Sequence, residues 1–261
     1  MTSTLGPLTM DEIVQAATVT VDTLEKLRYP CYLFGSAACA LYRSTESWHR
    51  TPHDIDIVVL ARKFEDVEDI KQTIALSSNR FVLKPSGNPR NTYQILYFKV
   101  PRPRVGPNRR RRRWGPRKEC KVDILLPGTL DLPRIPVKRI SWLINLPVAP
   151  FKTLILLKLF GWYERRVDRR VEMRARSRQD ATDIVKLLNF VMLNCDVMDG
   201  GGEWCPSSLH ERARDWVRLF IAQKPTTAGA WGFLGFDIEV RKAPTRSLEG
   251  IGNWDLIINV Q

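Results

Sequence analysis

The pattern of apolar and polar positions changes along the chain. Up to about residue 130, short stretches with a two-residue period alternate with stretches in which apolar residues recur every three or four positions. After that point only the helical period is clear. The pattern predicts an α/β (α+β) protein, with a small, mixed, twisted sheet flanked by helices and then a helical subdomain. The expected divisions are 1–130 for the sheet domain, 131–223 for the helical subdomain and 224–261 for an extension of unknown role.

Local signals place the individual elements. The run Thr9-Met10-Asp11-Glu12 is a capping box and predicts the start of the first helix. Strands are expected at 31–34, 54–60, 80–84, 92–100 and 119–126. Further helices are expected at 37–42, 64–75, 149–166, 177–194 and 207–223.

The charge of the chain is concentrated in one segment. The formal net charge is +13, and the window from Lys99 to Lys121 alone contains eleven basic residues and one acid. Its centre, residues 101–118, has four prolines, two glycines and the run Arg109–Arg113, which predicts a long hairpin loop. Such a patch attracts polyanions, RNA or tRNA among them. A solvated loop without a partner explains the charge pattern equally well, and an arginine run also serves as a nuclear localisation signal.

Cysteine usage and hydropathy bear on the compartment. The five cysteines show no CxxC spacing and only three histidines are present, so no metal site of Cys and His is predicted. The apolar runs are short and the first residues do not resemble a signal peptide. We expect reduced thiols in an intracellular protein with no membrane contact, cytoplasmic or, through the arginine run, nuclear.

The strand at 54–60 carries two acids among apolar residues. Asp54 and Asp56 are two positions apart, so their side chains share one face of the strand, and Ile55 and Ile57 take the other. A third acid, Asp123, lies in the apolar run KVDILL. If the two strands are neighbours, three carboxylates converge, and they remain ionised only beside cations. Oxygen ligands suit Mg²⁺ or Mn²⁺, although an isolated DxD is more often a strand-end or turn feature.

The run FGSAA stands between a predicted strand and a predicted helix. Gly35 would let the backbone approach a phosphate closely, and the Ser36 hydroxyl would add a donor at a helix start, where free N–H groups bind anions. An ordinary tight turn with a serine cap accounts for the turn when it is taken alone.

Together these runs resemble the DNA polymerase beta-like nucleotidyltransferase superfamily. FGSAA, RTPHDIDIVV and CKVDILL match its glycine-serine turn, its acid-x-acid strand and its third acid. LLKLFGWYERR and RSRQDATDIVKLL look like the helical signature of its smaller, bacterial-type members, which act in antibiotic resistance or as toxins. The chain departs from the pattern at two places. Its turn has one glycine where many members have two, and Gln179 stands where the family usually has lysine.

The resemblance implies a role for each matching residue. Gly35, Ser36 and Lys158 would bind the triphosphate, while Asp54, Asp56 and Asp123 would be catalytic and would hold two Mg²⁺ or Mn²⁺ ions. Two further acids match the signature, and a structural role between helices is favoured for them: Asp180 and Asp183. Four arginines could steer an anionic substrate, although a solvated helix face explains the same pattern: Arg165, Arg166, Arg169 and Arg170.

The implied activity is transfer of a nucleoside monophosphate from a nucleoside triphosphate to an acceptor, with release of pyrophosphate. The basic segment favours RNA or tRNA as the acceptor. A small-molecule hydroxyl, a protein side chain, a nucleotide- or RNA-binding protein without turnover and a purely structural partner protein remain alternatives.

Overall fold

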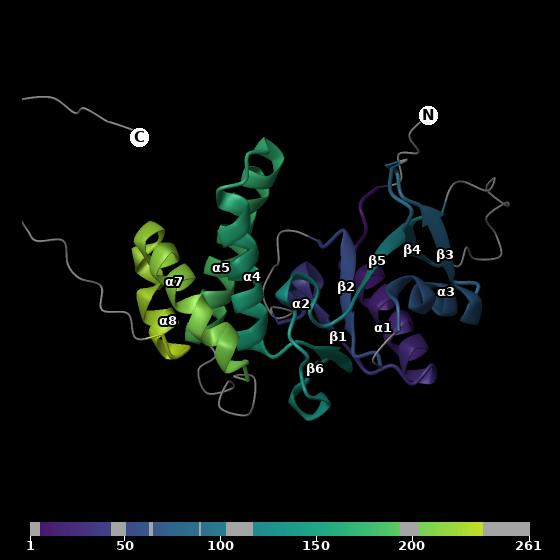
Figure 1. Ribbon diagram of the computed structural model, residues 1–261, viewed down its shortest axis with the longest axis horizontal. Coiled ribbons are helices and arrows are strands. Elements are labelled where there is room, and N and C mark those ends of the chain that lie inside the picture. The colour runs from purple at the N-terminus through teal and green to yellow at the C-terminus, as the bar shows by residue number, and fades with distance from the viewer. Residues whose placement is uncertain are drawn as a thin grey trace, which may run out of the picture.

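The computed structural model describes residues 6–42, 51–62, 65–88, 90–102, 117–193 and 204–236. Its centre is one seven-stranded sheet with the strand order β3-β4-β5-β2-β1-β7-β6 (Figure 1). The strands are β1 Cys31–Phe34, β2 Asp54–Val59, β3 Phe81–Pro85, β4 Gln94–Lys99, β5 Glu119–Leu125, β6 Ser141–Leu143 and β7 Leu146–Val148.

The sheet is mixed, as the sequence predicts. β2 pairs with β5, and β1 with β7, in parallel, whereas the other neighbours are antiparallel. On β2, Ile55 and Ile57 are fully buried, while Asp54 and Asp56 on the opposite face keep part of their surface exposed. The helices α1 (Met10–Lys26) and α3 (Val67–Ser77) pack on the strands and on each other. One face of the sheet therefore forms the apolar core, and the acids lie on the other.

The start of α1 confirms the predicted capping box. The Thr9 hydroxyl accepts a hydrogen bond from the Glu12 backbone N–H at 3.2 Å, and the Thr9 N–H donates to the Glu12 carboxylate at 2.8 Å. Two otherwise free backbone donors are thus satisfied. For α3 the start differs from the expected residue 64, because Asp66 caps the helix through the Glu68 N–H.

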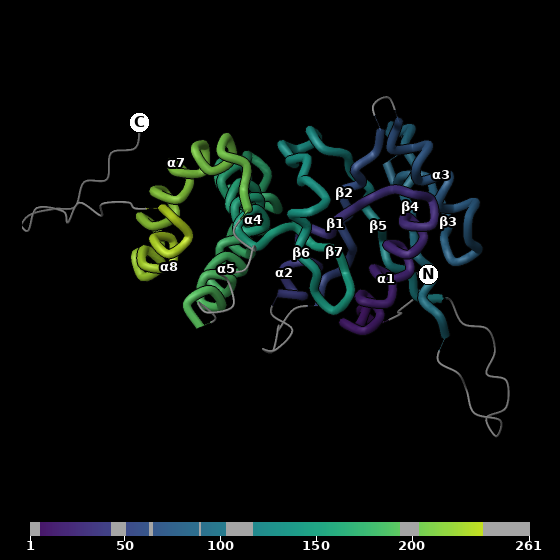
Figure 2. Tube along the Cα trace, turned by 90° about the horizontal axis from the view of Figure 1, so that it is seen from below, coloured from purple at the N-terminus to yellow at the C-terminus, as the bar shows by residue number. Residues whose placement is uncertain are grey.

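The remaining helices form a second group. They are α4 (Phe151–Arg166), α5 (Val171–Leu193), α7 (Ser207–Gln223) and α8 (Ala228–Phe233). Figures 1 and 2 show them gathered at one end of the molecule, with the sheet, α1 and α3 at the other. Trp162 meets Phe220 edge to face at 5.0 Å, and the buried Trp231 packs on the same ring at 6.1 Å. Aromatic packing holds α4, α7 and α8 together.

The hairpin of β6 and β7 was not predicted. Its strands have three residues each, too few to show alternation, and the turn between them has positive φ at Ile144 and Asn145. Leu33 of β1 pairs with Val148 of β7. The expected division at residue 130 would place this hairpin with the helices, whereas its strands belong to the sheet.

Two further elements differ from expectation. α5 begins at Val171, six residues before the predicted start, because the arginine-rich first turns have no apolar period. α8 forms within the segment 224–261, to which no structure was assigned. The run Arg109–Arg113 lies outside the described residues. In the part of the chain that is described, no helix is long and apolar enough to cross a membrane, and the described cysteines are free: Cys31, Cys39, Cys120 and Cys205.

Candidate active site

The register of β2 and β5 brings the three predicted aspartates together. Asp56 lies directly opposite Asp123, and Asp54 lies opposite Lys121. Because directly paired residues point to the same side of a sheet, all four side chains share one face. We call Asp54, Asp56 and Asp123 the acid triad.

The triad changes the protonation of its central member. Burial, the largest cause, and the charges of Asp54 and Asp123 together raise the pKa of Asp56 to about 7, against weaker opposition from Lys121 and Lys158. Three nearby carboxylates with limited access to water resist full ionisation. A divalent cation shared among them would remove this repulsion.

The donor chemistry of the triad fits a hard divalent cation, because every ligand is a carboxylate oxygen. The side chains of the triad are not positioned as ligands of a metal ion in this structure. Lys121 Nζ lies 2.5 Å from Asp123 Oδ2, and among the residues that the structure describes no three His, Cys, Asp or Glu side chains are arranged to hold a metal ion. Asp123 would have to exchange Lys121 for the cation.

Gly35 begins α2 (Gly35–Tyr42) directly after β1, beside the triad. Its φ is +67°, and a Cβ at this position would lie 2.1 Å from Oδ2 of Asp56. Phe34 is paired with Asp56 across β1 and β2, which brings the turn to the carboxylate. The sequence predicts Gly35 for close approach to a phosphate, whereas its close contact in the structure is Asp56. Ser36 follows as the second residue of α2 and is half-buried.

Lys158 of α4 is held by the two acids of the α5 signature. Its Nζ lies 2.8 Å from Asp180 Oδ1 and 3.1 Å from Asp183 Oδ2, and its side chain is 11% exposed. Burial opposes the charge, but the neighbouring Cys39 and both carboxylates outweigh it and raise the pKa of Lys158. Asp183 also accepts a hydrogen bond from Gln179 at 2.9 Å. The favoured structural role of Asp180 and Asp183 agrees with these contacts.

No sequence-family model matches the chain, and no curated protein matches it by sequence. A solved structure does match: the crystal structure of an antigenic nucleotidyltransferase-like protein from Paracoccidioides brasiliensis. The TM-score is 0.60 with 14% sequence identity, over 87% of this chain and 95% of the other. This chain has a nucleotidyltransferase-like fold.

Within this nucleotidyltransferase-like fold, the predicted site residues come from three parts of the chain. The acid triad lies on β2 and β5, and Gly35 and Ser36 open α2 beside it. Lys158 comes from the helical group, and its charge contributes to the pKa of Asp56. The structure therefore brings the named residues to one region, while their roles with metal and nucleotide stay predictions.

Sequence reasoning missed Lys121, which was counted only as part of the basic window. The available signal was its position two residues before Asp123, which puts both side chains on one face of β5. The ion pair between them raises the pKa of Lys121 against the opposing effect of burial. Lys121 is thus the positive group that pairs with the triad in the absence of a bound cation.

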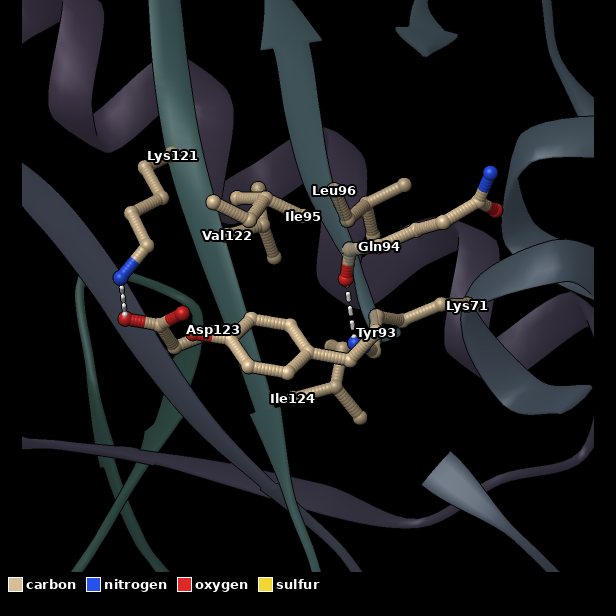
Figure 3. Close-up of a pocket in the computed structure, with 9 residues that line it drawn as sticks. All are labelled: Lys71, Tyr93, Gln94, Ile95, Leu96, Lys121, Val122, Asp123 and Ile124. Atoms are coloured by element: carbon tan, nitrogen blue, oxygen red, sulfur yellow. Dashed lines mark hydrogen bonds and ion pairs between the residues drawn. The ribbon is translucent and has the colours of Figure 1, made fainter. Parts of the chain in front are cut away.

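A cavity of about 250 Å³ opens beside Asp123 in the nucleotidyltransferase-like fold. In Figure 3, Lys121 and Asp123 lie on one side, Lys71 lies on the other, and the ring of Tyr93 lies between them. Lys71 Nζ donates to the Gln94 carbonyl at 2.6 Å and lies 5.7 Å from the centre of the Tyr93 ring. The cavity leaves room for a small part of a ligand next to the third carboxylate of the triad.

Proposed function

We propose that the protein is a metal-dependent nucleotidyltransferase. It would transfer a nucleoside monophosphate from a nucleoside triphosphate to an acceptor hydroxyl, with pyrophosphate as the leaving group. The observation that supports this most strongly is the in-register pairing of Asp56 with Asp123 on neighbouring parallel strands. The nucleotidyltransferase-like fold agrees with it.

The roles follow from the positions of the side chains. Asp54, Asp56 and Asp123 would hold two Mg²⁺ or Mn²⁺ ions, and bound divalent ions supply charge neutralisation and activation of a hydroxyl. Asp123, next to the cavity, would also orient the acceptor hydroxyl and accept its proton. The start of α2, with Gly35 and Ser36, would bind the triphosphate through backbone N–H groups. Lys158 would add a positive charge from the helical group.

RNA or tRNA is the acceptor that the net charge of +13 favours. A small-molecule or protein hydroxyl is the alternative. Binding that depends steeply on salt would support RNA, and binding that is nearly independent of salt would support a small neutral acceptor.

The test is incubation with labelled nucleoside triphosphates, Mg²⁺ and total cellular RNA, with transferred label and released pyrophosphate as the readouts. Asp54→Asn and Asp56→Asn should lose at least a hundredfold in rate, as expected when charge stabilisation at a reacting group is removed. Asp22→Asn, an exposed change on α1, is the matched control and should keep full rate. Full activity of Asp56→Asn would refute the proposal.

A second candidate is a nucleotide- or RNA-binding protein of the same fold without turnover. The ion pair of Lys121 with Asp123, and the engagement of Lys158 by Asp180 and Asp183, favour it, because both lysines are already paired. A rise in melting temperature with nucleotide and Mg²⁺, without release of pyrophosphate, would support this reading.

A further inference from the structure

The helices α4 and α5 meet in a short connection that is rich in arginine. Residues 165–178 contain seven arginines and two acidic residues, and we call this segment the arginine tip. In Figure 1 the end of the α4–α5 hairpin projects beyond the neighbouring elements. We infer that the arginine tip is the docking surface for the phosphate backbone of an RNA acceptor. That the bound RNA is the acceptor of the transfer rests on the proposed function.

Part of the tip is used to build the turn. Arg170 pairs with Asp168 at 2.8 Å, and Arg174 Nη1 donates to the carbonyls of Asp168 and Arg169 at 2.8 Å each. Arg166 lies with its guanidinium 4.8 Å from the centre of the Tyr163 ring. These contacts fix the backbone of the tip, so that the other arginines project from a defined scaffold.

Three arginines of the tip have no such task. Arg169, Arg176 and Arg178 are exposed and make no ion pair with any residue in the described ranges. Arginines gathered in one short segment create a positive local potential, which attracts an anionic partner. Guanidinium groups bind phosphate oxygens in pairs of hydrogen bonds, which makes arginine well suited to a nucleic-acid backbone.

The tip is connected to the proposed active site through described contacts. Arg165 stands seven residues after Lys158, so it lies on the same face of α4, about 11 Å further along the axis. Both side chains pair with Asp180. Because the charge of Lys158 also acts on Asp56, positive groups extend from the acid triad to the tip. An acceptor end at the triad and a backbone on the tip fit one continuous chain.

The test compares two variants with the same loss of charge. Arg169→Gln/Arg176→Gln/Arg178→Gln removes the three free arginines of the tip. The control, Arg80→Gln/Lys138→Gln/Arg139→Gln, removes three exposed basic residues outside the helical group. Binding of a short single-stranded RNA of mixed sequence is measured at several KCl concentrations, without nucleotide or metal, after circular dichroism shows that both variants are folded.

We expect the tip variant to bind RNA at least tenfold more weakly at low salt. The slope of log K against log salt should become shallower by about 2, because each phosphate contact on a single strand contributes about 0.7. The control should keep the slope of the wild type. Equal losses in both variants, no binding by the wild type, or equally strong tip-dependent binding of an acidic peptide would overturn the inference.

The proposed function fails in a different way. If RNA binds through the tip but no label is transferred, the proposed transferase activity is refuted and the docking surface is still supported. Asp22→Asn, an exposed change on α1 outside both the triad and the tip, should bind the RNA as tightly as the wild type.

Discussion

Asp56 and Asp123 lie opposite each other on the neighbouring parallel strands β2 and β5. This pairing puts two carboxylates on one face of the sheet, with Asp54 two residues before Asp56 on the same face. Burial and, after it, the repulsion from Asp54 and Asp123 raise the pKa of Asp56 to about 7. Holding ionised carboxylates this close together is unfavourable, and such an arrangement in a folded protein is typical of a site for a positively charged partner.

The raised pKa of Asp56 predicts how stability depends on pH in the absence of divalent cations. Between the ordinary pKa near 4 and the folded value, the native state binds more protons than the unfolded state, so the free energy of unfolding falls as pH rises. Asp56→Asn removes this dependence and should be more stable than the wild type at pH 8 by about 2 kcal/mol. Each pKa unit corresponds to about 1.4 kcal/mol, and the partial exposure of Asp56 reduces the total for the whole shift.

Urea unfolding at pH 5 and pH 8 in EDTA checks this expectation. The gain of Asp56→Asn should be largest at pH 8 and small at pH 5, where Asp56 is already protonated. A gain that is the same at both pH values would show that the carboxylate titrates normally.

Replacing Gly35 with alanine should disturb both the turn and the triad. The φ of +67° is strained for alanine, and the new Cβ would overlap Oδ2 of Asp56. We expect a loss of about 2 kcal/mol in the free energy of unfolding and a loss of transferase activity. Gly229→Ala, in α8 and with open space around the glycine, is the control and should be neutral or slightly stabilising. Equal stability of both variants would contradict the account of the turn.

The burial of Lys158 separates its structural role from its proposed role with nucleotide. Lys158→Met leaves Asp183 without its positive partner among the described residues and Asp180 with Arg165 alone, and should cost about 3–5 kcal/mol. Adding Asp183→Asn should recover part of that loss, because Gln179 can still bond to the asparagine. If Lys158 binds the triphosphate, the double variant regains stability but keeps a raised KM for nucleotide. Recovery of a normal KM would assign Lys158 a structural role alone.

Lys121 is expected to compete with a divalent cation for Asp123. Lys121→Met removes the ammonium group that lies 2.5 Å from Asp123 Oδ2 and leaves the aliphatic part of the side chain. The increase in melting temperature on adding Mg²⁺ should therefore be larger in this variant than in the wild type. Thermal unfolding with and without Mg²⁺ measures it, and an unchanged increase would mean that the ion pair does not oppose cation binding.

The sequence predicted the acid triad because strand alternation fixes which side chains share a face. The prediction that Asp54 and Asp56 share a face required only this rule. The prediction that Asp123 lies next to them depended on the family resemblance. Other features were beyond sequence reasoning for physical reasons. The strands β6 and β7 are too short to carry a period, and the positive φ of Gly35 and its contact with Asp56 arise from tertiary packing.

The central claim is that Asp54, Asp56 and Asp123 form one cation-binding centre. Binding of Mn²⁺, followed by the loss of the free-ion signal in electron paramagnetic resonance, tests it most directly. The wild type should bind Mn²⁺, and Asp54→Asn, Asp56→Asn and Asp123→Asn should each weaken binding at least tenfold, with Asp22→Asn unchanged. Wild-type affinity in all three triad variants would contradict the claim.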